Sequence, residues 1–398
     1  MDIIIISEFC EDFSKTDNDR FLYLAKMLAN VSNDNEIEIV TSSFQHTKKK
    51  HRREPREQWP FKITFIMEPG YPKNVCLKRF FSHYIWGKNV LNYIRNREKK
   101  PDVIYCAVPS LTGPNLVAKY CEKEHIRFII DIQDLWPEAF QMAFNMPVIS
   151  NIIYTPLTAL ANGVYKRANA ICAVSDTYCQ RAKAVNKKAK ETVTVYLGTE
   201  IETFDKCSKA KIKIEEEEIL LGYAGTLGTS YDLPLVFDAL KIVNNTNLKF
   251  IIMGDGPLKN KFVQLSKGLN VFFTGRLPYD QMCGILKACD MVVNPIVSAS
   301  VATIINKHAD YAACGKPVLN TQRSEEYKRL VEEYQMGFNC ENEEELAERI
   351  SELIKNVDLR RTMGNNARRC AEERFDRKTN YTKIVKQITD YHINERYK

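Results

Sequence analysis

The stretch SVATIINKHADYAACGKPVLNT, residues 300–321, decides how the second half of this chain is interpreted. It predicts a loop, a short helix whose first turn carries Asn306 and Lys307, an exit through small residues to Gly315, and a buried strand from Pro317. A helix start offers unpaired N–H groups and a positive dipole end, so a lysine there is unfavourable unless an anion completes the site. The alternative is a solvated lysine on an ordinary crossover helix, and the stretch alone leaves both interpretations open.

The residues around this stretch alternate buried strands with helices. Strands are expected at 219–224, 248–253, 270–274, 290–294 and 317–320, and helices at 232–243, 257–266 and 280–288. Gly225, Thr226, Gly228, Gly254 and Arg276 follow three of these strands, at the edge where parallel sheets bind ligands. Neither G-x-x-x-x-G-K-[ST] nor G-x-G-x-x-G occurs. The pattern predicts a site for a nucleoside diphosphate.

The first half of the chain follows the same alternation. Strands are expected at 2–6, 36–40, 62–67, 102–106, 127–131, 170–174 and 193–196, and helices near 20–29, 75–97, 114–124, 147–168 and 176–185. His46 and Asp134 fall in loops at the carboxyl edge, where they can meet a substrate, although a lone histidine in a basic loop is often only a surface residue. Asp17 and Asn18 begin a D-x-D sequence that also suits a helix N-cap, so we expect a substrate contact there and no metal.

Charge is distributed unevenly along the chain. Residues 48–100 carry fifteen Lys or Arg against four Glu, a net +11, whereas the whole chain carries +7. Within this strip Leu77, Phe81, Tyr84, Ile85 and Leu91 recur at helical spacing beside basic residues. The pattern predicts either a basic amphipathic helix in an anionic membrane interface or a helix that packs its apolar stripe on the sheet. No motif for binding nucleic acid is present, so no nucleic-acid partner is expected.

Cysteine usage and the N-terminus bear on location. The twelve cysteines are scattered without a C-x-x-C pair, and several lie in apolar runs, which is typical of reduced, buried thiols. Residues 1–13 lack the basic region and cleavage site of a signal peptide, and no apolar run approaches the roughly 20 residues that span a bilayer. We therefore expect a cytoplasmic protein that is peripheral at the inner face of the membrane.

Several motifs together resemble family 4 glycosyltransferases of the GT-B fold. The carboxyl-terminal motifs are GYAGTLGTSYDL, IIMGDGPLKNKF, FFTGRLPYDQM, CDMVVNP and NKHADYAACGKPVLNT. VTSSFQHTKKKHR and DIQDLWPEAF are similar to bacterial members that assemble capsule, exopolysaccharide or O-antigen repeat units. The resemblance implies two Rossmann-like, doubly wound parallel-sheet domains that face a cleft. We expect an acceptor domain at 1–200, a donor domain at 201–375 and a helix at 376–398 returning to the first domain, with 198–218 as a solvated linker.

The resemblance also implies an activity. Such enzymes transfer a sugar, with retention, from a nucleoside diphosphate sugar to an acceptor hydroxyl without a required metal or cofactor. We expect UDP as the nucleotide, a hexosyl group as the sugar and a lipid-linked saccharide as the acceptor. The expected donor-binding residues are Gly225, Thr226, Gly228, Gly254, Arg276, Asn306, Lys307 and Asp310, with Asp17, Asn18 and His46 on the acceptor side. Lys307, His46 and Asp134 are the expected catalytic residues.

The chain departs from the family pattern at two places. The family acidic pair places its second acid at Asp310 and its first at Ala302, so one carboxylate is missing. The loop TLGTSYD also lacks the Arg and Lys that usually bind the donor phosphates. Two alternatives therefore stay open, a GT-B-fold sugar-nucleotide epimerase and a non-catalytic GT-B subunit that serves a partner enzyme.

Overall fold

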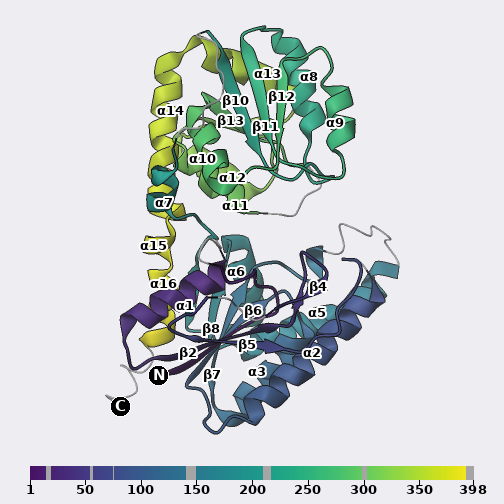
Figure 1. Cartoon of the computed structure of the whole chain (residues 1–398), viewed down its shortest axis with the longest axis vertical. Helices are drawn as coiled ribbons and strands as arrows, with labels where there is room; N and C mark the ends of the chain where they lie inside the picture. The colour runs from purple at the N-terminus through teal and green to yellow at the C-terminus, as the bar shows by residue number, and fades with distance from the viewer. Residues whose placement is uncertain are drawn as a thin grey trace. The chain divides into compact units, whose positions relative to one another are not determined.

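The computed structural model describes residues 1–14, 19–53, 57–74, 76–139, 149–208, 217–297 and 303–390, with only the backbone of 149–153. These residues form two compact units (Figure 1). Unit 1 comprises Met1–Val195 and the residues from Tyr381 onward, and unit 2 comprises Tyr196–Asn380. The sequence placed these divisions at 200 and 376.

Unit 1 is built on a seven-stranded parallel sheet of order β5-β2-β1-β6-β7-β8-β9. Its strands are β1 (Asp2–Ser7), β2 (Glu36–Ser42), β5 (Lys62–Ile66), β6 (Val103–Val108), β7 (Arg127–Ile132), β8 (Ala170–Ala173) and β9 (Glu191–Thr194). A short antiparallel pair, β3 (Phe44–Gln45) and β4 (Lys50–His51), follows β2. The run DIIIIS of β1 is buried throughout, as expected of a central parallel strand that is covered on both faces.

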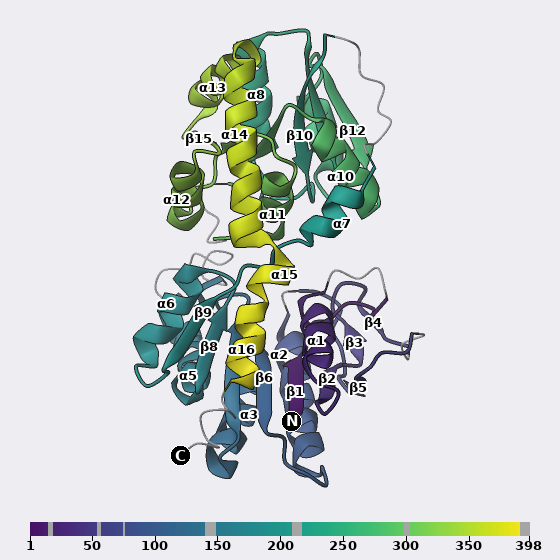
Figure 2. The same cartoon turned by 90° about the vertical axis from the view of Figure 1, so that its left-hand side faces the viewer.

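Helices cover the sheet of unit 1. They are α1 (Arg20–Val31), α2 (Leu77–Arg95), α3 (Thr112–Glu124), α5 (Ile149–Arg167), α6 (Asp176–Val185) and the returning α16 (Thr382–Thr389). α2 packs along α3, whereas α16 contacts α1 and β9 (Figure 2). Asp19 caps α1 by accepting from the N–H groups of Phe21 and Leu22 at 2.8 and 3.0 Å, which confirms the N-cap interpretation for this residue.

Unit 2 has a six-stranded parallel sheet of order β12-β11-β10-β13-β14-β15. Its strands are β10 (Ile219–Ala224), β11 (Leu248–Met253), β12 (Val271–Gly275), β13 (Met291–Asn294), β14 (Val318–Asn320) and β15 (Gly337–Asn339). The helices are α7 (Ile201–Lys206), α8 (Leu233–Val243), α9 (Lys259–Leu265), α10 (Tyr279–Ala288), α11 (Asn306–Ala313), α12 (Glu325–Tyr334), α13 (Glu343–Lys355), α14 (Val357–Cys370), the π-helical turn η1 (Ala371–Phe375) and α15 (Arg377–Asn380). Two parallel-sheet Rossmann-like domains confirm the fold class expected from the sequence.

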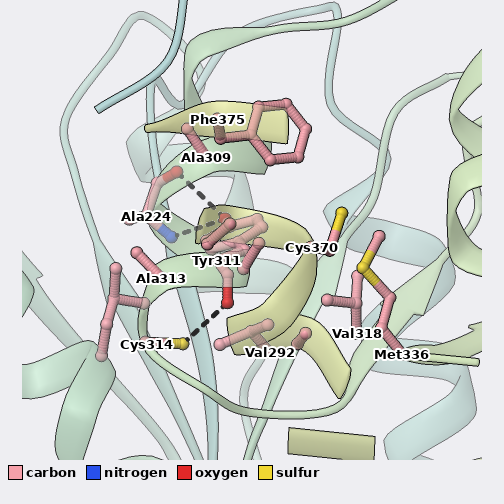
Figure 3. Packing of buried hydrophobic residues seen from close by; sticks show 14 of the residues in the cluster. Ala224, Val292, Ala309, Tyr311, Ala313, Cys314, Val318, Met336, Cys370 and Phe375 are labelled. Carbon is pink, nitrogen blue, oxygen red and sulfur yellow. Dashed lines mark hydrogen bonds between the residues drawn. The ribbon is translucent and has the colours of Figure 1, made fainter. Parts of the chain in front are cut away.

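Tyr311 fixes α11 against the sheet of unit 2. Its hydroxyl accepts from the N–H of Ala224 at 3.0 Å and donates to the carbonyl of the same residue at 3.2 Å (Figure 3). Cys370 and Phe375 belong to the same buried cluster, so α11 lies between the end of β10 and the last helices of the unit. Burial of these side chains sets the start of α11 beside the loop that follows β10.

Three expectations need correction. The proposed linker 198–218 contains α7, because Phe204 is fully buried in the core of unit 2 and the Lys287 ammonium donates to the carbonyl oxygens of Phe204 and Asp205. β9 begins two residues earlier than expected. The apolar stripe assigned to the helix at 75–97 is wrong as a single stripe, because Leu77, Phe81 and Tyr84 are exposed whereas Leu91 is buried.

All twelve cysteines are free and ten of them are buried, as expected for reduced thiols. No helix in the described part of the chain is both long enough and apolar enough to cross a membrane.

Candidate functional site

The glycines after β10 and β11 allow two loops of unit 2 to pack together. The N–H of Gly225 donates to the carbonyl of Met253 at 2.8 Å, and a methyl group on Gly254 would lie 1.8 Å from the carbonyl oxygen of Gly225. A methyl group on Gly228 would meet the Thr226 side chain at an ordinary contact distance of 3.7 Å. The carbonyl of Thr226 accepts from the Tyr223 hydroxyl at 3.0 Å. The two loops therefore place glycine backbone, which no side chain covers, at the carboxyl edge of the sheet, next to the start of α11.

Lys307 lies at this edge, beside two tyrosine rings. Its ammonium is 3.6 Å from the centre of the Tyr231 ring, 4.9 Å from that of Tyr223, and donates to the Tyr223 hydroxyl at 3.4 Å. A methyl group on Gly225 would lie 1.8 Å from this ammonium, so the glycine makes room for it. Burial lowers the pKa of Lys307 to about 7, because a charged amine loses hydration there. Among the described residues no carboxylate pairs with it.

Asp310 lies one turn further along α11 in a different environment. The Tyr279 hydroxyl donates to its Oδ1 at 2.8 Å, and the same hydroxyl is 2.7 Å from Oγ1 of Thr199. Burial raises the pKa of Asp310 to about 6, while the hydrogen bonds from Tyr279 and Thr199 act in the opposite direction. The carboxylate is therefore oriented by its neighbours before any ligand arrives.

The other expected donor-binding residues are more open. Asn306 and Arg276 are exposed, and Arg276 makes no hydrogen bond or ion pair with the described residues. Lys307, Gly225 and Gly254 thus come together in space, whereas the Arg276 side chain is exposed to solvent. Asp17, Asn18 and Ala302 lie outside the described residues, so their expected roles remain predictions.

His46 and Asp134 take up different surroundings in unit 1. His46 Nδ1 lies 2.6 Å from the Tyr71 hydroxyl, and burial, followed by the charges of Lys49 and Arg79, lowers its pKa to about 4. Asp134 accepts from the N–H of Leu135 at 2.9 Å and from the indole N–H of Trp136 at 3.3 Å, so both of its carboxylate oxygens form hydrogen bonds within their own loop. Burial raises the pKa of Asp134. At neutral pH His46 is therefore an uncharged hydrogen-bonding group.

A buried acidic cluster in unit 1 escaped the sequence reasoning. Glu8, which follows β1, and Glu68, which follows β5, are 3% and 1% exposed, and their ligand atoms lie within 4.8 Å of each other and of His83. Ser82 donates to Glu68 at 2.7 Å, and Ser42 also donates to it. Burial raises the pKa of both carboxyls. The signal in the sequence was a glutamate shortly after each of two predicted strands, 2–6 and 62–67.

This cluster has the donor atoms of a cation site, but its neighbour opposes one. His83 Nε2 lies 3.6 Å from Glu8 Oε1 and accepts from Arg79 Nε at 3.4 Å. A metal ion bound by His83 would therefore meet a guanidinium that already occupies this nitrogen. Since burial raises the pKa of both carboxyls, the arrangement favours protonated acids over a divalent cation.

Comparison with known proteins identifies unit 2. Residues 205–370 match the family profile of glycosyl transferases group 1. Unit 2 is therefore similar to the domain of group 1 glycosyl transferases. Over 168 residues the chain is 27% identical to an uncharacterized glycosyltransferase of Methanocaldococcus jannaschii, covering 41% of this chain and 44% of that protein. Over 221 residues it is 25% identical to N-acetyl-alpha-D-glucosaminyl L-malate synthase of Bacillus anthracis, covering 53% and 56%. These matches span about half the length of the relatives.

Solved structures extend the likeness to both units. Anabaena HepE in complex with UDP is 17% identical with a TM-score of 0.70, covering 98% of this chain and all of that one. WaaG, a glycosyltransferase involved in lipopolysaccharide biosynthesis, is 15% identical with a TM-score of 0.65, covering 97% and 99%. Both units therefore share the fold of these structures, and the site around Lys307 lies inside the part of the chain that matches the family profile.

Proposed function

We propose that the chain is a retaining, metal-independent glycosyltransferase that moves a hexosyl group from a UDP-sugar to a lipid-linked saccharide in cell-surface polysaccharide synthesis. The observation that carries this proposal is Lys307, a half-buried lysine at a helix start that pairs with no carboxylate among the described residues. An anion that accepts from both the helix N–H groups and the ammonium would satisfy the site. The UDP bound to HepE and the role of WaaG in lipopolysaccharide synthesis support the choice of donor and pathway.

The proposed chemistry uses the leaving group as the base. The bond between the anomeric carbon and the diphosphate oxygen breaks, and Lys307 and the start of α11 stabilise the charge that develops on that oxygen. The acceptor oxygen forms its bond on the same face, and its proton passes to the departing phosphate. Asp310 holds the ribose hydroxyls, while His46 and Asp134 orient the sugar or the acceptor. Lys307 thereby replaces the phosphate-binding Arg and Lys that the loop TLGTSYD lacks.

The epimerase alternative needs paired acids that reach the donor sugar. Glu8 and Glu68 form an acidic pair, but both are almost completely buried, which disfavours contact with a donor. Incubating the chain with UDP-N-acetylglucosamine and no acceptor distinguishes the two, since an epimerase changes the sugar without releasing UDP.

A transfer assay tests the main proposal. Thermal shift against UDP, GDP, ADP and their sugars first identifies the nucleotide, because a ligand that binds only the folded state raises its stability. Transfer from that donor to lipid extracts is then compared for the wild type, Lys307→Ala and Lys267→Ala, an exposed lysine before β12. We expect loss of transfer only in Lys307→Ala. Unchanged transfer in this variant would refute the assigned site.

The membrane part of the proposal rests on the outer face of α2. Leu77, Phe80, Phe81 and Tyr84 are 88%, 39%, 58% and 44% exposed and recur at helical spacing. Lys78 and Lys88 are exposed on the same helix. The charges suit an anionic lipid surface, into which the apolar side chains would insert.

Vesicle sedimentation tests this contact. The wild type should bind phosphatidylglycerol vesicles more strongly than phosphatidylcholine vesicles, and added salt should weaken the binding. Replacing Leu77 and Phe81 together by Ser should weaken it by roughly tenfold or more, because their apolar surface no longer leaves water. Ile242→Ser, at a residue of unit 2 that is 53% exposed, is the matched control. Failure to bind phosphatidylglycerol vesicles would exclude the membrane contact, and equal binding to the two vesicles would exclude the role of the basic residues.

A further inference from the structure

Two cations of unit 1 are held together by one neutral residue. Arg79 Nη1 donates to the carbonyl oxygen of Asn74 at 2.8 Å, and Lys49 Nζ donates to the side-chain oxygen of the same residue at 2.6 Å. Within the described ranges neither cation has a carboxylate at ion-pair distance, although Arg79 is only 8% exposed. Placing like charges together with neutral partners is unfavourable, and a bound anion would relieve it.

The groups around these cations are suited to an anion as well. The Tyr71 ring lies 4.7 Å from Lys49 Nζ and 5.5 Å from the guanidinium carbon of Arg79. Lys49 can only donate, so its 3.3 Å contact makes His46 Nδ1 an acceptor and leaves the proton of the neutral ring on Nε2. This Nε2 has no partner among the described residues. Two cations and one N–H donor are therefore available around one aromatic ring.

Among the described residues, neither Glu8 nor Glu68 forms an ion pair with Lys49 or Arg79. Burial raises the pKa of Glu8 well above its ordinary value, which favours its neutral form. Burial also raises the pKa of Glu68, whose carboxylate accepts from the hydroxyls of Ser42 and Ser82. Arg79 instead stacks over Trp136, with its guanidinium carbon 4.7 Å from the ring centre. An incoming anion would thus meet two cations that form no ion pair with the described residues.

We propose that Lys49, Arg79 and His46 bind a phosphate or diphosphate group of the acceptor substrate. The position on α2 indicates the source of this group, because Arg79 lies in the same two turns as the exposed Leu77 and Phe81. A lipid phosphate would place its chain along the apolar face and its charged group at the cations. A soluble sugar phosphate offers the same charged group without the chain. The assignment as an acceptor site rests on the proposed glycosyl transfer, whereas binding of the phosphate does not.

Calorimetric titration of the full chain separates these sources. Farnesyl diphosphate, farnesol and inorganic pyrophosphate are titrated with UDP at saturation, so that the site near Lys307 is already filled. Binding of pyrophosphate, with tighter binding of farnesyl diphosphate and none of farnesol, supports a lipid diphosphate. Equal binding of the two diphosphates supports a soluble phosphorylated acceptor. If neither diphosphate binds, the site does not exist.

Variants assign the binding to these residues. Lys49→Gln should weaken pyrophosphate binding about tenfold or more, because a charge-assisted contact is lost. Arg79→Lys, which keeps the charge but loses the planar fork, should also weaken it. Lys48→Gln removes a neighbouring lysine that pairs with Asp12 and is the matched control.

UDP binding serves as the folding check in every variant. Wild-type affinity for pyrophosphate in both Lys49→Gln and Arg79→Lys, with UDP binding intact, would overturn the assignment. Failure of the wild type to bind any nucleotide would instead overturn the proposed function and leave the pyrophosphate result standing.

Discussion

Binding of UDP should depend on pH through Lys307. In the free protein burial holds the pKa of this lysine at about 7, so near neutral pH it is charged in only part of the molecules. A diphosphate beside the ammonium favours the charged form and should return the pKa toward its ordinary value. Binding should therefore take up a proton whenever the pH is above about 7.

The size of the effect follows from the pKa of Lys307 in the free protein, about 7, and from the higher, ordinary lysine value expected in the complex. Binding should take up about half a proton at pH 7 and close to one at pH 8.5, and the dissociation constant should rise about fivefold between pH 7 and 8. The ionisable groups around Lys307 should not titrate between pH 7 and 8.5. Burial raises the pKa of Tyr223 and Tyr231 and holds that of His308 far below 6.5, while Asp310 titrates at about 6. The second ionisation of a phosphate group also lies near pH 6.

Calorimetry in buffers of different ionisation heat measures both quantities. Lys307→Met should bind UDP roughly tenfold more weakly at pH 7 and lose the proton uptake. Gly225→Ala should have a similar effect on affinity, because the added methyl group would lie 1.8 Å from the ammonium and displace it. Lys267→Met should behave as the wild type. A dissociation constant that stays constant from pH 7 to 8, without proton uptake, would refute the reasoning.

The lowered pKa of Lys307 also predicts how the stability of the free protein changes with pH. An unfolded lysine titrates near 10.4, so between pH 7 and that value the unfolded chain binds the proton and the folded chain does not. The free protein should therefore lose stability as the pH falls from about 10 to 7 and change little from this group below 7. Lys307→Met should raise the melting temperature at pH 7 while lowering affinity for UDP, as expected where function opposes stability.

Two further substitutions test other parts of the structure. Tyr279→Phe removes the donor to Asp310, so the pKa of that carboxyl should rise above 6, the acid side of the UDP-binding profile should move to higher pH, and stability should fall by about 1 kcal/mol; an unmoved acid side would mean that another group controls it. Arg20→Met should cost about 3–5 kcal/mol in urea unfolding, because Asp131, 2.7 Å away and fully buried, is left unpaired. Adding Asp131→Leu should recover much of this loss, and no recovery would contradict the explanation.

The fold of unit 2 was accessible from sequence for a local reason. Strands β10 and β11 are apolar runs that end at glycines, and both were predicted with the bounds the structure has. Such runs identify buried parallel strands without knowledge of their neighbours. The motif at 300–321 likewise placed Lys307 in the first turn of α11.

The sequence did not show which residues of unit 1 meet. Glu8, Glu68 and His83 are separated along the chain, and only the parallel order of β1, β2 and β5, with α2 beside them, brings them together. The face of α2 was equally undetermined. Large side chains occur on both sides of its first turns. Arg79 and His83 nevertheless lie in the interior, where Arg79 stacks on Trp136 and His83 lies beside Glu8.

The amino-acid sequence by itself determined two β/α domains, a loop-rich carboxyl edge in each, and a lysine at a helix start, because these depend on local patterns of burial and glycine. Tertiary structure alone decided that Lys307 is desolvated between two tyrosines, that Tyr279 and Thr199 hold Asp310, and that Lys49 and Arg79 share Asn74. The physical reason is that desolvation and charge proximity depend on which distant segments pack together, and the chemistry of both candidate sites depends on those two quantities.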